Sequence, residues 1–185
     1  MNGNLTTIKP LIKNKMENNH WYAMYVKMHH EKKTAEKLYN MGIRNFLPLQ
    51  ERVKQWSDRK KKVKEVVIPM MIFINTDEKT RIEILKTIPS INGTMIDRTT
   101  HKPAVIRDDE MERFMFMLDY SESAVSFTTE TLKPGEKVEV IKGPLNGLKG
   151  ELMETDGKCQ VSVRLNMLGC AIVEMPVGYL KKIEN

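Results

Sequence analysis

VVIPMMIFIN, residues 66–75, is the stretch that decides the expected fold of this 185-residue chain. After Pro69 every residue through Ile74 is apolar, so neither face of a strand here is suited to water. Pro69 lacks the N–H that a central ladder position needs, which places it at the beginning of the strand. Two interpretations stay open. This is a central strand covered on both faces within its domain, or it offers one apolar face to a partner protein.

The composition is that of an ordinary globular chain with one strongly basic region. Hydrophobic residues make up 41% of the chain and charged residues 29%, which suits one domain or two small ones. The formal net charge is +6, yet residues 27–65 alone hold 12 Lys or Arg against 5 Asp or Glu. Such a concentration is either a solvated surface or the electrostatic footprint of a polyanionic partner.

The cysteines and the lack of long apolar segments indicate the cellular compartment. Cys159 and Cys170 are the only cysteines and show no metal-binding or redox spacing, which is typical of a reduced, cytoplasmic protein. We expect two buried thiols rather than a redox pair. No apolar run approaches the roughly 20 residues of a membrane helix, and residues 1–20 lack the apolar core of a signal peptide. The sequence therefore predicts neither membrane insertion nor export.

The first half of the chain alternates between strand and helix patterns. Residues 1–20 are polar and rich in Asn, which predicts a flexible extension before the aromatic strand that begins at Trp21. Gly42 is placed to end a helix that starts at Glu31, and Asp77 to cap a helix that ends before Pro89. Further strands are expected at 45–49, at 91–96, interrupted by Asn92-Gly93 and with a turn before it, and at 103–106. A third helix opens at Asp108 or Asp109, with Met111, Phe114, Met115 and Leu118 on one face.

The second half has a different character. Residues 121–133 are rich in Ser and Thr without a clean period, which predicts a flexible linker. Alternating valines at 138 and 140, and turns at Gly143-Pro144 and Asn146-Gly147, then indicate a strand-rich region. Gly150 suits close backbone approach at a barrel corner, and short strands are expected at 160–165, 170–174 and 180–183. The fold class is thus α+β, an α/β half followed by a small all-β barrel.

Residues 135–150 resemble a KOW motif, the turn-and-glycine pattern of small SH3-like barrels. Together with WYAMYVK (21–27), FLP (46–48) and IPMMIFI (68–74), the chain resembles the NusG family of transcription factors. The stretches KPAVIRD (102–108) and FMLDYS (116–121) are similar to UpxY-type members, which antiterminate capsular polysaccharide operons. The resemblance implies an NGN-type α/β sandwich at 21–120, a linker at 121–133 and a KOW domain at 134–185.

The resemblance also implies partners. Family members bind the clamp coiled coil of RNA polymerase through an apolar patch, whose matching positions here are Ile68, Met71 and Phe73. The sequence departs from the family at this patch, with Met70 where glycine is usual and Met71 where tyrosine is usual, although the patch stays apolar. In the antiterminator branch, the positions of Lys27, Lys33 and Lys37 face the non-template DNA strand. Solvated surface lysines are the alternative interpretation.

Two further segments are candidate contacts. Residues 52–64 carry seven basic residues against one acid, which predicts a protruding, mobile basic hairpin. Its functional interpretation is contact with upstream duplex DNA or nascent RNA through Trp56, Arg59, Lys60, Lys61 and Lys62, and its alternative is a solvated charged loop. Met167 and Leu168 occupy the loop where family members dock a ribosomal protein or Rho, and core packing is their alternative.

The sequence offers no catalytic constellation, so we expect no enzyme, metal or cofactor. The histidine side chains do not converge, and phosphate loops, nucleophile elbows and two-metal carboxylate clusters are missing. The predicted function is a specialised antitermination factor that binds RNA polymerase and promotes processive elongation through a target operon, by resemblance one for capsular polysaccharide. The alternatives are a general NusG-type elongation and termination factor and a ribosome-associated KOW protein that binds RNA.

Overall fold

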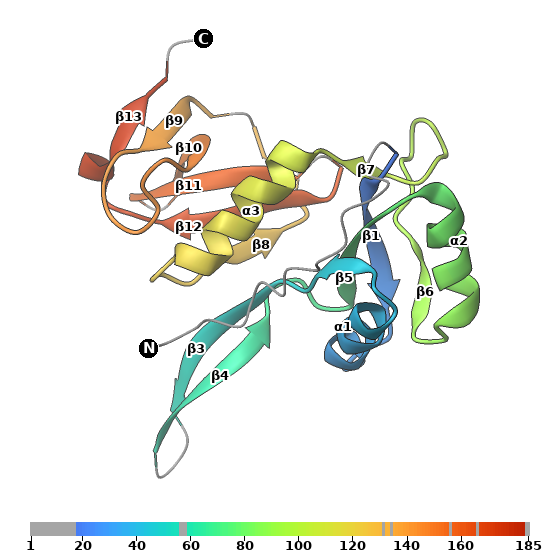
Figure 1. Ribbon diagram of the computed structural model, residues 1–185. Coiled ribbons are helices and arrows are strands. Elements are labelled where there is room, and N and C mark those ends of the chain that lie inside the picture. Colours follow the sequence, from blue (N-terminus) through green and yellow to red (C-terminus); the bar gives the residue numbers. More distant parts are fainter. Residues whose placement is uncertain are drawn as a thin grey trace. The chain divides into compact units, whose positions relative to one another are not determined.

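The structure is a computed structural model that describes residues 18–55, 59–130, 132–133, 135–155, 157–165 and 167–183 (Figure 1). The chain divides into two compact units. The first unit consists of Met1–Pro48 and Ile68–Asp108, and the second of Leu49–Val67 and Asp109–Asn185. These units differ from the domain bounds expected from the sequence, because the basic hairpin and most of the third helix group with the C-terminal strands. The expected bounds, 21–120 and 134–185, stay a prediction.

The first unit is an antiparallel sheet in the order β2-β5-β1-β6, with β7 paired to β1. Its strands are β1 (His20–Val26), β2 (Arg44–Phe46), β5 (Met71–Thr76), β6 (Ile91–Thr94) and β7 (Val105–Ile106). The central position expected for the apolar stretch is confirmed, since β5 lies between β2 and β1. Every residue of β5 except Asn75 is buried, so both of its faces are covered.

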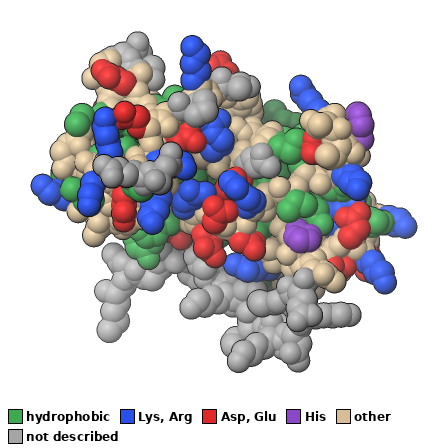
Figure 2. Space-filling view, turned by 90° about the horizontal axis from the view of Figure 1, so that it is seen from above, with side chains coloured by type: hydrophobic (Ala, Val, Ile, Leu, Met, Phe, Trp, Pro, Cys, Tyr) green, Lys and Arg blue, Asp and Glu red, His purple; other side chains and the backbone are tan. Residues whose placement is uncertain are grey.

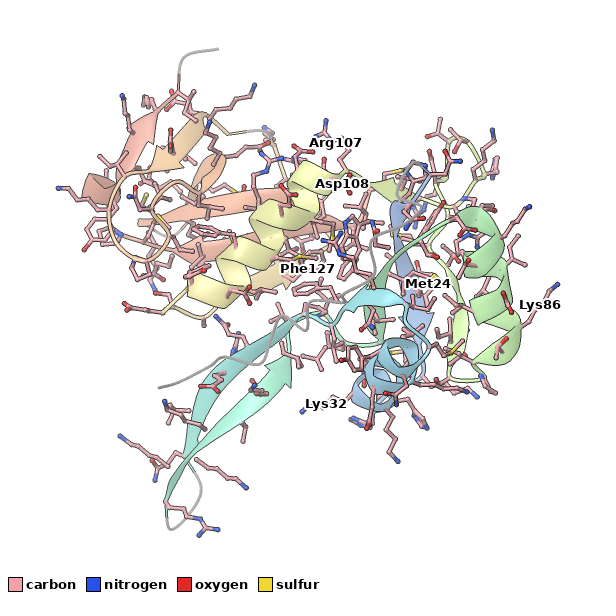
Figure 3. The ribbon with its side chains drawn as sticks, viewed as in Figure 1. Met24, Lys32, Lys86, Arg107, Asp108 and Phe127 are labelled. Atoms are coloured by element: carbon pink, nitrogen blue, oxygen red, sulfur yellow. The ribbon has the colours of Figure 1, made fainter. Side chains whose placement is uncertain are left out.

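Helices α1 (Glu31–Asn40) and α2 (Glu78–Thr87) complete the first unit. The β1–β5 register places Tyr22 opposite Ile74 and Met24 opposite Ile72. Arg81 of α2 stacks its guanidinium 5.5 Å from the Tyr22 ring centre and donates a 2.8 Å hydrogen bond to Thr94. Helix α2 therefore covers the face of the sheet that carries Tyr22 and Met24, and burial raises the pKa of Tyr22 (Met24 is labelled in Figure 3).

The expected helix ends are confirmed. Gly42, just after α1, has a φ of +74° and donates its N–H to the Tyr39 carbonyl, as a C-terminal cap does. Asp77 caps α2 by accepting a 3.0 Å hydrogen bond from the Thr80 N–H. The turn expected before this strand lies at Pro89-Ser90, but the expected interruption at Asn92-Gly93 is wrong, because both residues belong to β6. Pairing with β1, helped by a bulge beside Tyr25, outweighs the local turn preference.

The second unit contains a two-stranded ribbon, one helix and a six-stranded sheet. Strands β3 (Leu49–Gln55) and β4 (Lys60–Val66) form the ribbon and confirm the expected hairpin. Helix α3 (Asp108–Tyr120), which begins at the last residue of the first unit, buries Glu110, Met111, Phe114, Met117 and Leu118. Its Phe114 ring centre lies 6.4 Å from that of Phe127, which is labelled in Figure 3.

The six-stranded sheet is antiparallel in the order β13-β9-β10-β11-β12-β8. Its elements are β8 (Ser126–Thr128), β9 (Lys137–Val140), β10 (Lys149–Thr155), β11 (Lys158–Leu165), β12 (Gly169–Glu174), the 3-10 helix η1 (Val177–Tyr179) and β13 (Leu180–Lys182). An all-β C-terminal region is confirmed. A Cβ at Gly150 would lie 2.6 Å from the Ser162 carbonyl oxygen, which bears out the expected close approach.

Part of the expected linker is ordered secondary structure. Strand β8 pairs with β12, and Val125 just before it is fully buried. Val125 and Phe127 are apolar residues on either side of Ser126, and this alternation suits a strand that buries one face. The expectation of a flexible tether is therefore wrong for residues 125–128.

One ion pair ties the middle of the six-stranded sheet together. The Arg164 guanidinium donates to the Glu151 carboxylate at 2.8 Å, and this hydrogen bond holds the pKa of Glu151 below its ordinary value. Within the described ranges, none of the helices is long and apolar enough to span a membrane.

Candidate functional site

The three apolar residues expected to bind a polymerase are buried in this structure. Ile68 and Met71 expose 6% and 8% of their surface, and Phe73 exposes none. The Phe73 ring packs 6.3 Å from that of Phe46, its pairing partner on β2. These side chains therefore form part of the core rather than an exposed patch. Their role in binding stays a prediction, and it requires that they become accessible.

The exposed apolar side chains beside this core are Met70 and Tyr25, each 42% exposed. They are neighbours, since Tyr25 pairs with Met71 and the Val26 N–H donates a 2.8 Å hydrogen bond to the Met70 carbonyl. Sequence reasoning did not select Tyr25. The sequence carried no local signal for its exposure, because Trp21 and Ala23, on the same face of the strand, are buried.

Met70 occupies a backbone conformation that favours glycine. Its φ is +60°, in the left-handed region, which costs a residue with a side chain about 1 kcal/mol. The turn is held by Glu31, whose carboxylate accepts a 3.0 Å hydrogen bond from the Met70 N–H and is itself nearly buried. The conformation explains why glycine suits this position, and it directs the methionine side chain outward.

The three lysines expected to form one cationic spot lie around a single segment. The Lys27 N–H donates to the Ser90 carbonyl at 2.9 Å, and Thr34, between Lys33 and Lys37 on α1, shares a 2.7 Å hydrogen bond with the Ser90 hydroxyl. The Lys37 ammonium donates to the Thr87 carbonyl at 3.5 Å. All three lysines are exposed. The fold thus brings them together, and their contact with DNA stays a prediction.

The basic hairpin is a ribbon fixed at its base. Gln50, 7% exposed, donates to the Ser123 carbonyl at 2.9 Å and accepts from the Val125 N–H at 2.9 Å. Arg52 donates to the Val125 carbonyl at 3.1 Å and lies 3.7 Å from the Glu65 carboxylate. These contacts attach one face of the ribbon to residues 123–125.

The β3–β4 register sorts the ribbon side chains into two faces. Gln50 opposite Glu65 and Arg52 opposite Val63 make up the anchored face. The other face, called the lysine face below, carries the pairs Glu51↔Lys64, Val53↔Lys62 and Gln55↔Lys60, all exposed. Of the predicted contacts, Lys60 and Lys62 therefore share a face, and Lys61 points to the opposite one. Arg59 is exposed just before β4, and Trp56 lies outside the described residues.

Met167 and Leu168, expected as one docking pair, are separated by the fold. Leu168 is 5% exposed and belongs to the core, whereas Met167 is 41% exposed with a φ of +65°. The left-handed backbone of Met167 precedes the buried Leu168 in this loop. A docking role for the two residues stays a prediction, and Met167 is the exposed member.

Acidic, histidine and cysteine side chains are the groups that could hold a metal ion. No group of three His, Cys, Asp or Glu residues in the described part of the chain is arranged to do so. Cys159 lies on β11 and Cys170 on the neighbouring strand β12. The residue of β11 opposite Cys170 is Arg164, well along the strand from Cys159, so the two thiols do not face each other. Burial raises the pKa of both thiols, which disfavours the reactive thiolate. On the face shown in Figure 2, basic and acidic side chains are interspersed and apolar ones occur in small groups.

One protein-family model matches the part of the chain that contains the strands of the first unit. The family described as "Transcription termination factor nusG" matches residues 19–115, just over half of the chain. The matched region includes β1 to β7 and the first half of α3. No curated protein sequence matches the chain at a significant level.

Solved structures give a match along most of the length. The structure described as "Domain interaction in Thermotoga maritima NusG" is 21% identical, covers 92% of this chain and 100% of its own, and has a TM-score of 0.50. At this identity the match concerns the fold alone. Two conformations of an MjSpt4:Spt5 complex are 16% identical with TM-scores of 0.28 and 0.29, covering 89% of this chain and 99% and 97% of theirs. Scores this low support no conclusion about the fold.

Proposed function

Because the chain belongs to the NusG family of transcription factors, we propose that it is a specialised member that binds RNA polymerase and promotes processive elongation through a target operon. The observation that carries the proposal is the family match, which spans every strand of the sheet built around β5. A factor that prefers the closed, elongating state of a polymerase clamp shifts the clamp toward that state. Pausing and termination then become less frequent.

The polymerase contact is assigned to the start of β5 in the first unit. Ile68, Met71 and Phe73 are the family positions, and Met70 with Tyr25 provides exposed apolar surface beside them. A partner would first touch this exposed pair, and contact with Met71 would follow as the side chain is uncovered. Methionine suits such a surface because it is unbranched and adapts its shape.

The nucleic-acid contacts belong to the same proposal. Lys27, Lys33 and Lys37 lie around one segment and supply positive charge for the phosphates of the non-template strand. In the second unit, the all-β region is proposed to be a KOW domain, which docks a ribosomal protein or Rho. Within its docking loop, exposure favours Met167 over Leu168 as the contacting residue.

The specialised role has its support in sequence. The stretches 102–108 and 116–121, which resemble the capsule-operon antiterminators, fall on β7 with the start of α3 and on the end of α3. The alternative within the family is a general elongation and termination factor. A transcription assay with purified polymerase and a terminator separates the two. The specialised factor raises readthrough, whereas the general factor raises termination when Rho is present.

Polymerase binding is tested by retention of the full-length chain on immobilised RNA polymerase. Met70→Glu places a charge on the exposed surface without disturbing the core, and Met71→Glu places a charge at the neighbouring buried position. We expect both variants to lose retention, because a buried unpaired charge is costly at an interface. Met41→Glu, at a methionine 41% exposed just after α1, is the matched control and is expected to be retained.

Equal retention of all three variants would overturn the assignment of this surface. Circular dichroism of each variant shows whether it is folded, and Met70→Glu keeps the test decisive if Met71→Glu unfolds. If no version of the chain is retained, while the full-length chain binds a ribosomal protein or RNA, the ribosome-associated alternative replaces the proposal.

A further inference from the structure

We propose that the β3–β4 ribbon binds double-stranded B-form DNA through its lysine face, with Lys60, Lys62 and Lys64 along one phosphate backbone. This deepens the proposed function and rests on it only for the source of the DNA, the duplex beside a transcribing polymerase. The starting observation is the register, which places these three lysines at every second position of β4 on one exposed face.

The lysine spacing fits a phosphate backbone. Alternate residues of an antiparallel strand are about 6.8 Å apart, so Lys60 and Lys64 are separated by about 13.6 Å. One strand of B-form DNA carries a phosphate about every 3.4 Å along the helix axis. Because the phosphates also wind around the axis, their spacing along the strand exceeds this rise, and the lysine spacing lets each of the three lysines reach a different phosphate of one strand. Glu51, opposite Lys64, is the single acid on this face, which leaves it a net positive charge.

The shape of the ribbon fits a DNA groove. Strands β3 and β4 pair only with each other among the described strands, so the ribbon is two strands wide (Figure 1). Seven residues in each strand give it a length of about 24 Å. The major groove of B-form DNA, about 12 Å wide, admits a two-stranded β-ribbon. Val53, at the centre of the lysine face and 60% exposed, is an apolar side chain suited to a sugar or a thymine methyl group.

The base of the ribbon fixes which face is available. Gln50 and Arg52 bind the backbone of residues 123–125 through the anchored face. That face is therefore committed to the second unit at the root of the ribbon. Because side chains of a strand alternate between faces, the lysine face is turned away from these contacts. A ribbon held at its root presents its lysines in a fixed row, which reduces the entropy lost on binding.

The same features disfavour RNA. The major groove of A-form RNA is deep and narrow, and side chains do not enter it. Binding of single strands relies on aromatic residues that stack on bases. None of the described residues that define the lysine face, which are Glu51, Val53, Gln55, Lys60, Lys62 and Lys64, is aromatic. Duplex DNA is thus the nucleic acid that this face suits best.

The test measures binding of the full-length chain to a fluorescent 20-base-pair DNA duplex by anisotropy over a series of salt concentrations. The triple variant Lys60→Gln, Lys62→Gln, Lys64→Gln, called the row variant below, removes the three lysines of the lysine face. The matched control Lys142→Gln, Lys149→Gln, Lys181→Gln removes three exposed lysines from the six-stranded-sheet region. We expect the row variant to bind on the order of 10- to 100-fold more weakly at 0.1 M salt. The slope of log K against log salt should fall by about 2.7, at about 0.9 per phosphate contact. The control should change the affinity and the salt slope much less than the row variant does.

A second variant keeps the composition constant. The exchange Lys62→Val with Val63→Lys moves one lysine to the anchored face while the net charge stays the same. We expect it to lose about one phosphate contact, seen as a slope smaller by about 0.9. Unchanged binding of this exchange variant, together with equal weakening of the row variant and its control, would show that only net charge matters and would overturn the proposal.

Competition and polymerase retention complete the test. Unlabelled duplex DNA should displace the probe better than duplex RNA or single-stranded RNA of the same length, and equal displacement by RNA would overturn the assignment to B-form DNA. The row variant should still be retained on RNA polymerase, because Met70 and Met71 are intact. Loss of DNA binding with polymerase retained thus separates this proposal from the proposed function.

Discussion

Strands β4 and β5 follow each other in the chain with four residues between them, and they have opposite characters. Strand β5 is buried at every residue but Asn75 and has a neighbouring strand on each side. Strand β4 has one neighbour, and its lysines are exposed. The comparison teaches that apolar content reports how many faces of a strand are covered. Strand β5 is covered on both faces, whereas the ribbon leaves one face of β4 to charged side chains.

The comparison also separates stability from binding. An isolated two-stranded ribbon is marginal in water, so β4 depends on the hydrogen bonds that Gln50 and Arg52 make at the root. Strand β5 instead contributes to the core of its own unit. Substitutions in β5 should therefore change the free energy of unfolding, and substitutions on the lysine face of β4 should change DNA binding with little effect on stability.

The largest expected effect is that of Phe73→Ala in β5. Phe73 is fully buried and packs on Phe46, so its truncation should lower the free energy of unfolding by about 3–5 kcal/mol. The matched change on the ribbon is Val53→Ala, at a residue 60% exposed, which should cost less than about 0.5 kcal/mol. Urea unfolding followed by circular dichroism measures both. Similar costs for the two changes would break the contrast between the strands.

A smaller effect is expected at the root of the ribbon. Gln50→Ala removes a buried amide and leaves the N–H of the buried Val125 without its acceptor, which should cost about 1–3 kcal/mol. Gln55→Ala, near the exposed end of β3, is the control and should stay within about 0.5 kcal/mol. Hydrogen exchange of the β3 and β4 amides should accelerate in the first variant only. Slow exchange in Gln50→Ala would show that the ribbon does not need this anchor.

Local patterns predicted the elements of both strands but not their surroundings. The apolar run, Pro69, the Asp77 cap and the turn glycines each act through near neighbours in sequence, so β5, α2 and the turns of the six-stranded sheet could be derived from them. Which lysines share a face depends on the pairing of β3 with β4, and no single residue of the hairpin specifies that register.

The candidate sites were harder to predict because exposure is a tertiary property. Met71 and Phe73 have apolar side chains suited equally to a core and to an interface, and the structure buries both. The same ambiguity applies to Met167 and Leu168, which the left-handed backbone of Met167 resolves. Strand β8 was missed because its one apolar residue, Phe127, stands among Ser and Thr, and only pairing with β12 reveals the strand.

Met70, between β4 and β5, offers a substitution that should raise the stability of the chain rather than lower it. Met70→Gly should stabilise the chain by about 0.5–1 kcal/mol, since glycine adopts a φ of +60° without the side-chain clash, although its unfolded chain is more flexible. Met28→Gly, at an exposed turn residue without positive φ, should be neutral or destabilising. Thermal unfolding of both variants measures the difference. Destabilisation by Met70→Gly would mean that side-chain contacts of Met70 outweigh the backbone strain.

The smallest expected effect lies just past the end of β5 and depends on pH. Hydrogen bonds from the Thr80 N–H and hydroxyl to Asp77 hold the pKa of its carboxyl below the ordinary 3.8. Because the pKa is lower in the folded chain, the carboxylate adds stability above about pH 4, and this part is lost as the pH falls through the folded value. Asn caps helices about as well as Asp, so Asp77→Asn should change stability by less than about 0.5 kcal/mol at pH 7.

The informative measurement for Asp77→Asn is therefore the free energy of unfolding at acidic pH, compared with that of the natural chain. Between pH 4 and pH 2 the variant should lose less stability than the natural chain, because its cap does not titrate. Glu83→Gln, on the exposed side of the same helix, removes a charge without removing a cap and serves as the control. If the natural chain and Asp77→Asn lose equal stability over this pH range, the Thr80 hydrogen bonds do not favour the ionised carboxyl. The start of α2, and with it the end of β5, would then owe its position to packing rather than to the cap.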